Sequence, residues 1–411
     1  MAKEIQSLRI AVISSTAPPT SGGGVGTAHY NLFRGLREKG LNAELFLFFQ
    51  RGAVATASAD ELEKYIHRFG PPARLRKALL TINNWVFAIL SPGKMAWNTA
   101  DIVTSAIGVR RMNRSLKEFN ADVIIFPDHG APGLFIQHQK DARIHLIAHH
   151  NPARLTEPLL GNYSRLDARI AVWLEQRVLR NVRKVVCPSH HMRTWFAKTY
   201  RFEGPVKVIP NVIFKDDILP KPTKDLRATM GLPADVIVIG IPSAQTAVKG
   251  ARLLAEIIRS VAAATPAELG FFLAGEIDKE VAAELERLPK NARLYAPGRL
   301  AHDEYLAAFS DCSFGIFPSL RDNYSMALVE ASVLGVPMLA FDAGGNADII
   351  VDGSNGRLIQ DLDAQAVTMA AVQLIREPQA LRALRESTRQ YARSHFDAGR
   401  TIDEYIDFLL K

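Results

Sequence analysis

Cysteine and long apolar stretches are scarce in this sequence. Its 411 residues include two cysteines, Cys187 and Cys312, too few for a disulfide framework or for a zinc site by themselves. Its longest apolar runs fall far short of the ~20 residues that a membrane-spanning helix needs. No apolar run precedes the first expected strand, so we expect no secretory signal and a cytoplasmic protein.

The composition is that of a folded protein. Hydrophobic residues make up 48% and charged residues 22%, which excludes a disordered or collagen-like chain. The length suggests two domains, because a typical domain has about 150 residues.

The positive charge is unevenly distributed. Lys and Arg exceed Asp and Glu by 50 − 42 = +8, and residues 51–120 hold eleven basic and five acidic residues. Such a region attracts phosphates of nucleic acids, anionic lipids or phosphorylated substrates, but a solvated basic surface has the same composition. Nucleic-acid binding is disfavoured because aromatic residues are not interleaved with the basic ones and no known module is present.

This region contains a candidate amphipathic helix, Ala73–Leu90. We expect a packed helix with a basic end, formed by Arg74, Arg76 and Lys77. A helix lying at an anionic membrane surface would have the same pattern and is the alternative. Its apolar stripe consists of Leu75, Leu79, Ile82, Val86, Ile89 and Leu90.

Short β-branched runs alternate with amphipathic helical patterns along the whole chain, which predicts an α/β protein with parallel sheets covered on both faces. Expected helices include 27–39, 251–261, 303–309 and 326–334. The expected strands are 9–14, 43–48, 122–128, 144–150, 184–190 and 206–211 in the first half, and 236–243, 270–276, 292–298, 312–319 and 337–345 in the second.

The two halves are separated by a proline-rich segment without clear periodicity, residues 207–233. We therefore expect two doubly wound, Rossmann-like domains, 1–210 and 211–395. A final helix at 401–410, within 396–411, is expected to pack back on the first domain. Ligands of such sheets bind beyond the carboxyl ends of the strands.

A glycine-rich loop, Ser21-Gly22-Gly23-Gly24-Val25-Gly26, follows the first expected strand and precedes a helix with Thr27 near its N-cap. Glycine allows close approach of a ligand, and a helix N-terminus favours phosphate. Gly23 and Gly24 are therefore candidate phosphate-binding residues; a purely structural loop is the alternative. NAD binding is disfavoured, because the loop is too long for the dinucleotide fingerprint and no acidic residue ends the second strand.

A more specific pattern spans residues 318–331. Asp322 lies in a loop after an expected buried strand, and Glu330 follows eight residues later on a helix. The helix start, near Ser325 and Met326, offers backbone N–H groups to a diphosphate. Because Glu330 is surrounded by apolar residues, we do not interpret it as a solvated surface charge.

Residues 318–356, with their carboxylate, seven-residue spacer, Glu and following Gly-Gly turn, resemble retaining GT-B glycosyltransferases of glycosyltransferase family 4. The likeness extends over most of the chain. It includes the loop Ser21–Gly26, strand 144–150, Pro188-Ser189, Ile209-Pro210-Asn211 and Val248-Lys249-Gly250.

The resemblance implies that the C-terminal domain binds a nucleotide-sugar donor and that the N-terminal domain binds the acceptor. It implies that Glu330 accepts hydrogen bonds from the ribose, that Asp322 holds the sugar, and that Lys249 balances the diphosphate charge without a metal or other cofactor. His150 would contact the sugar from the opposite wall, although a core histidine is the alternative. The other implied donor-binding residues are Ser243, Asn323, Tyr324, Ser325 and Met326.

The sequence departs from the family pattern at three positions. At the first, Val212 follows Asn211 where Gly is usual; the other two lie in the expected donor site. Asp322 stands where Glu is usual, and Ala244 where an Arg five residues before the Lys is usual. Both features are similar to family members that build bacterial surface polysaccharides. The expected acceptor is therefore a growing O-antigen, capsule or exopolysaccharide glycan, or its polyprenyl-diphosphate carrier, at the inner face of the cytoplasmic membrane.

A double displacement needs a carboxylate beneath the anomeric carbon of the sugar. The sequence offers Asp128 and Glu157 as candidates but assigns neither to this role. We therefore predict front-face substitution with retention. The alternatives are a GT-B enzyme with a small-molecule acceptor, a sugar-nucleotide epimerase, or a non-catalytic nucleotide- or nucleic-acid-binding protein.

Overall fold

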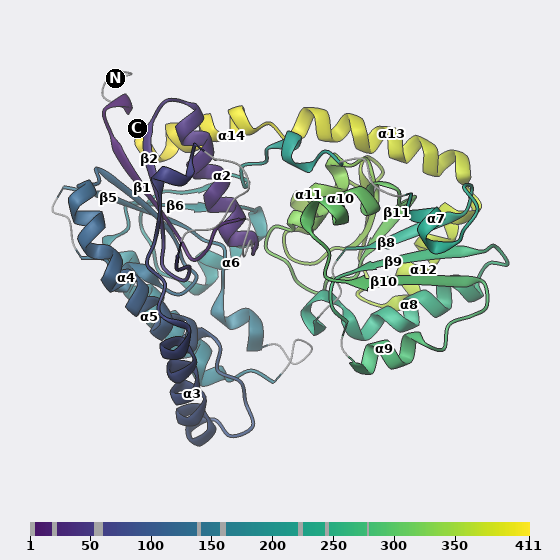
Figure 1. Cartoon of the computed structure of the whole chain (residues 1–411), viewed down its shortest axis with the longest axis horizontal. Helices are drawn as coiled ribbons and strands as arrows, with labels where there is room; N and C mark the ends of the chain where they lie inside the picture. Colours follow the sequence, from purple (N-terminus) through teal and green to yellow (C-terminus); the bar gives the residue numbers. More distant parts are fainter. Residues whose placement is uncertain are drawn as a thin grey trace. The chain divides into compact units, whose positions relative to one another are not determined.

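A computed structural model of the chain describes residues 5–18, 23–52, 61–137, 141–156, 162–220, 225–242, 246–277 and 279–411. It divides into two compact units (Figure 1). The first unit contains Met1–Ile213 and Ala398–Lys411, and the second contains Phe214–Asp397. The chain passes from the first unit to the second after Ile213, three residues later than the boundary expected from sequence.

The first unit contains a parallel sheet in the order β3-β2-β1-β4-β5-β6-β7, flanked by helices. Its strands are β1 (Arg9–Ser14), β2 (Asn42–Leu47), β3 (Ile66–Arg68), β4 (Val123–Pro127), β5 (Arg143–Ile147), β6 (Lys184–Cys187) and β7 (Val206–Val208). Its helices are α2 (Gly24–Glu38), α3 (Ala73–Leu90), α4 (Asn98–Phe119), α5 (Arg165–Val178), α6 (His190–Thr199) and α14 (Ala398–Tyr405).

The second unit repeats this plan with the order β10-β9-β8-β11-β12-β13, again parallel. Its strands are β8 (Ile237–Ile241), β9 (Leu269–Ala274), β10 (Ala292–Gly298), β11 (Phe314–Phe317), β12 (Met338–Phe341) and β13 (Gly356–Ile359). Its helices are α7 (Leu226–Met230), α8 (Ala251–Ala263), α9 (Lys279–Leu285), α10 (His302–Ser310), α11 (Met326–Val333), α12 (Ala364–Arg376) and α13 (Pro378–His395).

The central strands are buried along their whole length because helices cover both faces of each sheet, which confirms the expected α/β class with two parallel sheets. Each unit has its own hydrophobic core. Side-chain caps start several of the surrounding helices: Ser164 caps α5, Ser189 caps α6 and Asp363 caps α12.

Several boundaries differ from the sequence expectations. The expected strand 184–190 ends at Cys187, because Ser189 caps the helix that begins at His190. Helix α2 begins at Gly24, so Thr27 lies within its first turn, bonded through its N–H to the Gly23 carbonyl. Strands β3 and β13 were missed because three or four residues are too few to show a period of two.

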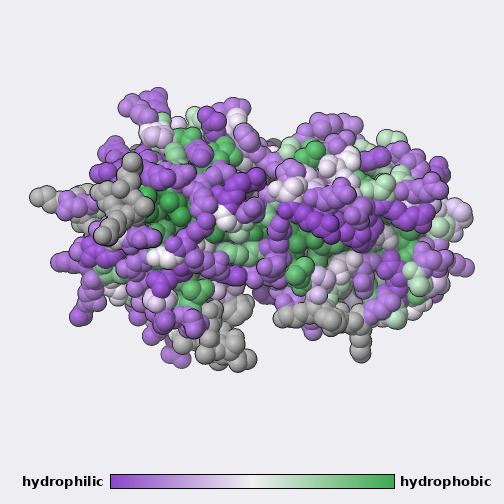
Figure 2. Space-filling model, turned by 90° about the horizontal axis from the view of Figure 1, so that it is seen from above, coloured by the Kyte–Doolittle hydropathy of each residue, from purple (hydrophilic) through white to green (hydrophobic). Residues whose placement is uncertain are grey.

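Helix α3 has the expected bounds, but the expectation of a packed helix is wrong for its apolar stripe. The helix buries Asn83 and Phe87, while Ile82, Trp85 and Ile89 are exposed. It extends beyond the sheet of the first unit (Figure 1). On the face shown in Figure 2, hydrophilic residues predominate and hydrophobic areas are small. Among the described residues, no helix is long and apolar enough to cross a bilayer.

The last segment of the chain returns to the first unit. Helix α14 packs against α2, and a π-helical turn, Ile406–Leu410, follows it. Arg143 on β5 donates to the Leu410 carbonyl at 2.7 Å, and Lys184 on β6 donates to the Phe408 carbonyl at 2.6 Å. The first unit is therefore completed by residues that follow the second unit in the chain.

This arrangement predicts that Ile402→Ala destabilises the first unit. Ile402 is buried, so we expect a loss of about 2–4 kcal/mol in the free energy of unfolding. Hydrogen–deuterium exchange should show the loss in β1, β2 and β5. As a control, Asp403→Ala removes an exposed ion pair with Lys39 and should cost at most about 1 kcal/mol. If Ile402→Ala speeded exchange only in the second unit, the packing of α14 on the first unit would be contradicted.

Candidate functional site

The second sheet brings Lys249 and Asp322 together. Its strand order reverses between β8 and β11, and the crevice beyond such a switch point is where doubly wound sheets bind ligands. Lys249 ends a short 3-10 turn, Ala247–Lys249, in the loop after β8, and Asp322 lies in the loop after β11. Lys249 Nζ donates to Asp322 Oδ2 at 2.5 Å.

Backbone contacts fix these two loops and a third one. Leu320 donates its N–H to the Val248 carbonyl at 2.9 Å, and Gly345, after β12, donates to the Asp322 carbonyl at 2.8 Å. Gly250 and Gly344 both have positive φ, and a Cβ there would lie about 2 Å from the carbonyl oxygens of Pro318 and Asp322, respectively. Only glycine fits such positions without strain, so the loops hold Lys249 and Asp322 in place.

The loop after β11 leads directly into helix α11. Ser325 is the N-cap residue and Met326 the first helical residue. Asn323 and Ser325 are buried, and burial raises the pKa of the Tyr324 hydroxyl. The first backbone N–H groups of a helix have no acceptor within the helix, and its dipole favours an anion at that end. Ser325, at this end of α11, lies three residues after Asp322 in the chain.

Glu330 lies one helical turn further along α11 and is largely buried. It accepts a hydrogen bond from His302 Nε2 at 3.0 Å, and this bond raises the pKa of His302. Sequence analysis missed His302, the first residue of α10, because no motif signals it and 28 residues separate it from Glu330.

Ser243 and Ala244 lie outside the described residues. Within the described ranges, no group of three or more His, Cys, Asp or Glu side chains is placed to hold a metal ion.

In the first unit, the structure places the two candidate glycines at the start of α2. Gly23 is its N-cap residue and Gly24 its first residue. A Cβ at either position would meet nothing within 4 Å among the described residues, and neither has positive φ. The described part of the chain therefore does not require glycine at these two positions.

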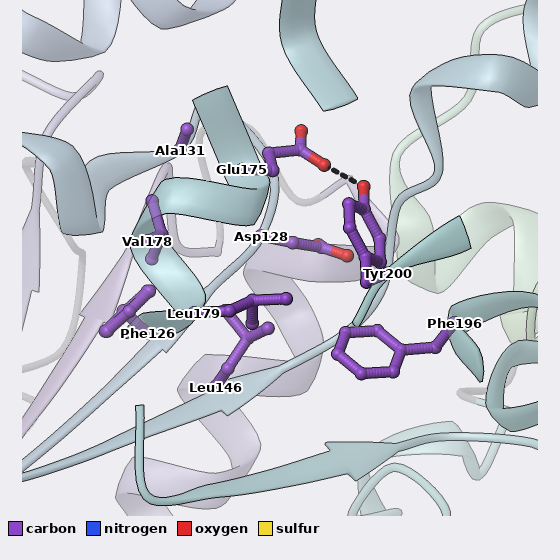
Figure 3. Close-up of a pocket in the computed structure, with 9 residues that line it drawn as sticks. All are labelled: Phe126, Asp128, Ala131, Leu146, Glu175, Val178, Leu179, Phe196 and Tyr200. Atoms are coloured by element: carbon purple, nitrogen blue, oxygen red, sulfur yellow. Dashed lines mark hydrogen bonds between the residues drawn. The ribbon is translucent and has the colours of Figure 1, made fainter. Parts of the chain in front are cut away.

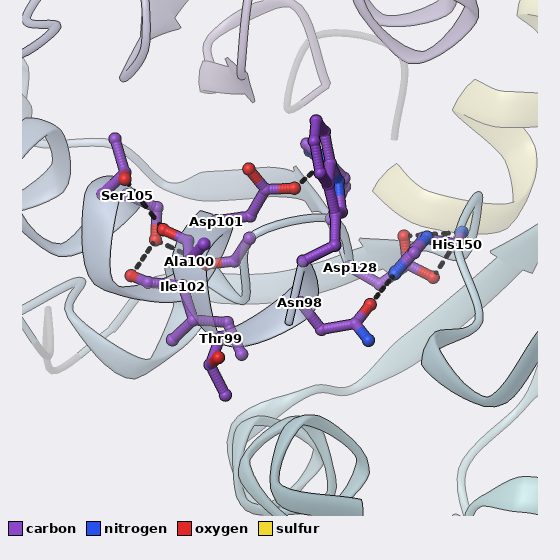
Figure 4. Close-up of polar contacts among 12 residues, drawn as sticks. Asn98, Thr99, Ala100, Asp101, Ile102, Ser105, Asp128 and His150 are labelled. Carbon is purple, nitrogen blue, oxygen red and sulfur yellow. Dashed lines mark hydrogen bonds and ion pairs between the residues drawn. The ribbon is translucent and has the colours of Figure 1, made fainter. Parts of the chain in front are cut away.

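His150 lies three residues beyond the end of β5 and is buried. Its backbone N–H donates to both carboxylate oxygens of Asp128, at 2.9 and 3.0 Å, and its ring Nε2 lies 3.0 Å from Asn98 Oδ1 (Figure 4). The ring of His149 instead packs against His29 on α2, with centroids 5.2 Å apart. The two neighbouring histidines thus contact different partners.

Asp128 belongs to a buried acidic group behind His150. With Glu175 and Tyr200 it lines a small pocket in the first unit, whose other lining residues are apolar (Figure 3). Burial raises the pKa of Asp128 to about 7, although the His149 and His150 N–H groups oppose this. Burial and the nearby Asp128 also raise the pKa of Glu175, which accepts a hydrogen bond from the Tyr200 hydroxyl. Glu157, the other carboxylate considered from sequence, lies outside the described residues.

The described site residues therefore form two groups. In the second unit, a cation, a carboxylate and a helix N-terminus lie at the switch point, with Glu330 behind them. Such an arrangement can bind a diphosphate and the hydroxyl groups of an attached sugar. In the first unit, Gly23, Gly24 and His150 lie at the same edge of the sheet as the carboxyl ends of β1 and β5.

The raised pKa of Asp128 predicts a pH-dependent stability. The folded protein keeps this proton up to about pH 7, whereas the unfolded chain loses it near the ordinary value of 3.8. The free energy of unfolding should therefore fall as pH rises through this window. Asn cannot ionise and can still accept from the same N–H groups, so Asp128→Asn should lose less stability between about pH 5 and about pH 8. Urea unfolding at both pH values measures this, and equal losses in both proteins would refute it.

Two family models match the chain, one on each unit. A model described as Glycosyltransferase Family 4 matches residues 22–216, and a model described as Glycosyl transferases group 1 matches residues 234–377. A putative glycosyltransferase of Bacillus subtilis, EpsD, is 29% identical over 160 residues, which is 39% of this chain and 40% of that protein. The chain spans about a quarter to two fifths of the length of the first curated relatives it matches.

Solved structures match over nearly the whole chain. Sucrose-phosphate synthase from Thermosynechococcus elongatus superposes with a TM-score of 0.73 at 17% identity, covering 97% of this chain and 98% of that one. Anabaena HepE, solved with UDP and glucose, gives a TM-score of 0.71 at 19% identity and covers 98% and 99%. These likenesses confirm the expected GT-B fold. Each unit thus matches one glycosyltransferase family model, and the chain has the GT-B fold and resembles glycosyltransferase family 4.

Proposed function

We propose that the protein is a retaining glycosyltransferase that transfers a sugar from a nucleotide-sugar donor to a glycan or lipid-linked acceptor. The observation that carries the proposal is the Lys249–Asp322 pair at the switch point of the second sheet, directly before the N-terminus of α11. A diphosphate needs positive charge and N–H donors, and the sugar hydroxyls need a carboxylate. This arrangement supplies all three.

In this proposal the donor lies along the second unit. Lys249 and the N–H groups at Ser325 and Met326 bind the diphosphate, and Asp322 leaves Lys249 to accept hydrogen bonds from the sugar. Glu330 exchanges its hydrogen bond with His302 for the ribose hydroxyls. Ser243, Asn323 and Tyr324 complete the donor contacts. Lys249 stabilises the charge that develops on the leaving diphosphate, so the reaction needs no metal.

The sugar is transferred by front-face substitution. The bond between the anomeric carbon and the diphosphate oxygen breaks, and the bond to the acceptor oxygen forms on the same face. The acceptor proton passes to the leaving phosphate, so no enzymic base is needed. Because the acceptor oxygen attacks the anomeric carbon directly, no enzymic nucleophile is needed either. Asp128 does not suit that role, because it is buried and occupied by the backbone N–H groups of His149 and His150. Gly23 and Gly24 approach the phosphates, and His150 contacts the sugar.

The acceptor belongs to bacterial surface polysaccharide synthesis in this proposal, as a growing glycan or its polyprenyl-diphosphate carrier. Support comes from the residue types at positions 322 and 244. Asp322 and Ala244 depart from the usual family pattern in the way that family members of that kind do. An acceptor on a lipid carrier would place the enzyme at the inner face of the cytoplasmic membrane.

The donor assignment predicts that Glu330 recognises the ribose. A nucleoside diphosphate should raise the Tm of the wild-type protein, since about 100 times its Kd adds roughly 2.7 kcal/mol of stability. Hydrogen bonds to a charged group contribute about 1.5–3 kcal/mol, so the 2′-deoxy form should bind at least about tenfold more weakly. In Glu330→Ala both forms should bind equally weakly. Thermal shift with UDP, GDP and ADP and their 2′-deoxy forms measures this.

Two controls separate the outcomes. Lys249→Ala should weaken binding of both forms of the nucleotide and keep the preference for the 2′-hydroxyl. His302→Ala should also keep the preference for the 2′-hydroxyl, because the ribose hydroxyls replace His302 as the hydrogen-bond partner of Glu330. If Glu330→Ala still preferred the nucleotide to its 2′-deoxy form as strongly as the wild type does, the assignment of Glu330 to the ribose would be contradicted. Binding without transfer to any acceptor or to water would favour a non-catalytic nucleotide-binding protein.

A further inference from the structure

We propose that the exposed face of α3 docks on a membrane surface that contains anionic lipids. This proposal rests on the proposed function, because a membrane that α3 contacts would present the lipid-linked acceptor to the enzyme. The surface is defined by Leu75, Ile82, Trp85 and Ile89, which we call the α3 stripe. These residues follow one another at intervals of seven, three and four, so they lie on one face of the helix.

The α3 stripe faces solvent. Trp85 is 67% exposed and Ile89 62% exposed. The helix is attached to the unit by its other side, where Phe87 is buried and Asn83 donates to the Ala96 carbonyl at 3.2 Å. Leu90, Met95 and Trp97, at and beyond the end of the helix, are exposed as well. Exposed large apolar side chains grouped on one side of a helix indicate an interaction surface rather than part of the core.

Charge identifies the occupant. Arg74, Arg76 and Lys77 lie exposed at the start of the helix and Lys94 lies exposed beyond its end. Residues 73–97 contain no Asp or Glu. A second copy of the chain on this face would bring like charges together, whereas anionic lipid headgroups complement them. Trp at the level of the headgroups and basic residues around an apolar face are the features of interfacial helices.

Vesicle flotation tests the proposal. The protein should float with vesicles of phosphatidylcholine and phosphatidylglycerol and bind phosphatidylcholine vesicles much less. The double variant Ile82→Ser, Trp85→Ser should reduce binding about tenfold or more. A matched control is Met369→Ser, since Met369 on α12 is 63% exposed. Arg74→Gln with Lys77→Gln should weaken binding to anionic vesicles, whereas Arg382→Gln on α13 should not.

Three results would overturn the proposal: no flotation at physiological salt, equal flotation of the stripe variant, or a dimer that the stripe variant converts to monomer. The last would make a second copy the occupant. Nucleotide-induced thermal shift of the same variants separates the two proposals. A stripe variant that still binds nucleotide shows an intact donor site, whatever the vesicles show.

A different observation carries a second inference: we infer that Asn98 is a positioning residue that sets the tautomer of His150. Asp167 on α5 accepts hydrogen bonds from the backbone N–H groups of Asn98 and Thr99, both at 2.9 Å, and from Asn98 Nδ2 at 2.8 Å. Because the carboxylate faces these donors as an acceptor, the Asn98 amide must turn its NH₂ toward Asp167. Its oxygen then faces His150.

An amide oxygen can only accept a hydrogen bond, so His150 Nε2, at 3.0 Å from it, carries the proton. Neutral His150 therefore has its proton on Nε2 and none on Nδ1. The backbone of the same residue is held by Asp128. Two buried acidic side chains thus fix His150: Asp128 holds its backbone, and Asp167 acts through Asn98.

The test uses Asn98→Ala, which leaves the backbone hydrogen bonds of Asp167 in place. Nitrogen-15 NMR of the imidazole should show the Nε2–H form in the wild type and a mixture in the variant. If His150 acts on the donor sugar, transfer should fall about tenfold with unchanged nucleotide affinity. Thr99→Val, which removes the hydroxyl that contacts Asp167 and Asn83, should change neither.

Persistence of the Nε2–H form in Asn98→Ala would refute the inference. A changed tautomer with unchanged transfer would instead show that Asn98 sets the tautomer but that His150 has no part in the reaction, which would contradict the role proposed for His150.

Discussion

The close approach of three loops at the carboxyl edge of the second sheet is the constraint on which the candidate site depends. The loops after β8, β11 and β12 meet at residues 318–322, joined by the Leu320–Val248 and Gly345–Asp322 backbone hydrogen bonds. Gly250 and Gly344 make this approach sterically possible. Lys249 and Asp322, which are 73 residues apart in the chain, can then form an ion pair. Because the sheet order reverses at the same place, the pair lies where a ligand can enter.

The first unit uses burial rather than glycine to hold its candidate site. Asp128 and Asp167 are both buried, and each accepts several hydrogen bonds from neighbouring loops and helices. A buried carboxylate is costly unless it is paired or bonded, so these networks tolerate few alternative arrangements. They converge on His150: Asp128 holds its backbone N–H, and Asn98, which is bonded to Asp167, holds its ring.

The parts of this description that were predictable from sequence are those encoded locally. Apolar runs identified the long strands, and the eight-residue spacing from Asp322 to Glu330 identified a loop leading into a helix. The missing parts depend on tertiary contacts. The Lys249–Asp322 pair follows from strand order, and His302 and Asn98 reach their partners from distant elements. The apolar side of α3, on which Leu75, Ile82 and Ile89 are exposed, was expected to pack because periodicity shows that a helix has an apolar side, but not which side faces the protein.

The most direct test of the account is the location of the donor. Hydrogen–deuterium exchange of the full chain should be measured with and without a nucleoside diphosphate that raises its Tm. We predict slower exchange at 246–250 and 318–330, and loss of that protection in Lys249→Ala. Protection confined to the first unit, or protection at 318–330 that Lys249→Ala leaves unchanged, would contradict the placement of the diphosphate at the switch point of the second sheet.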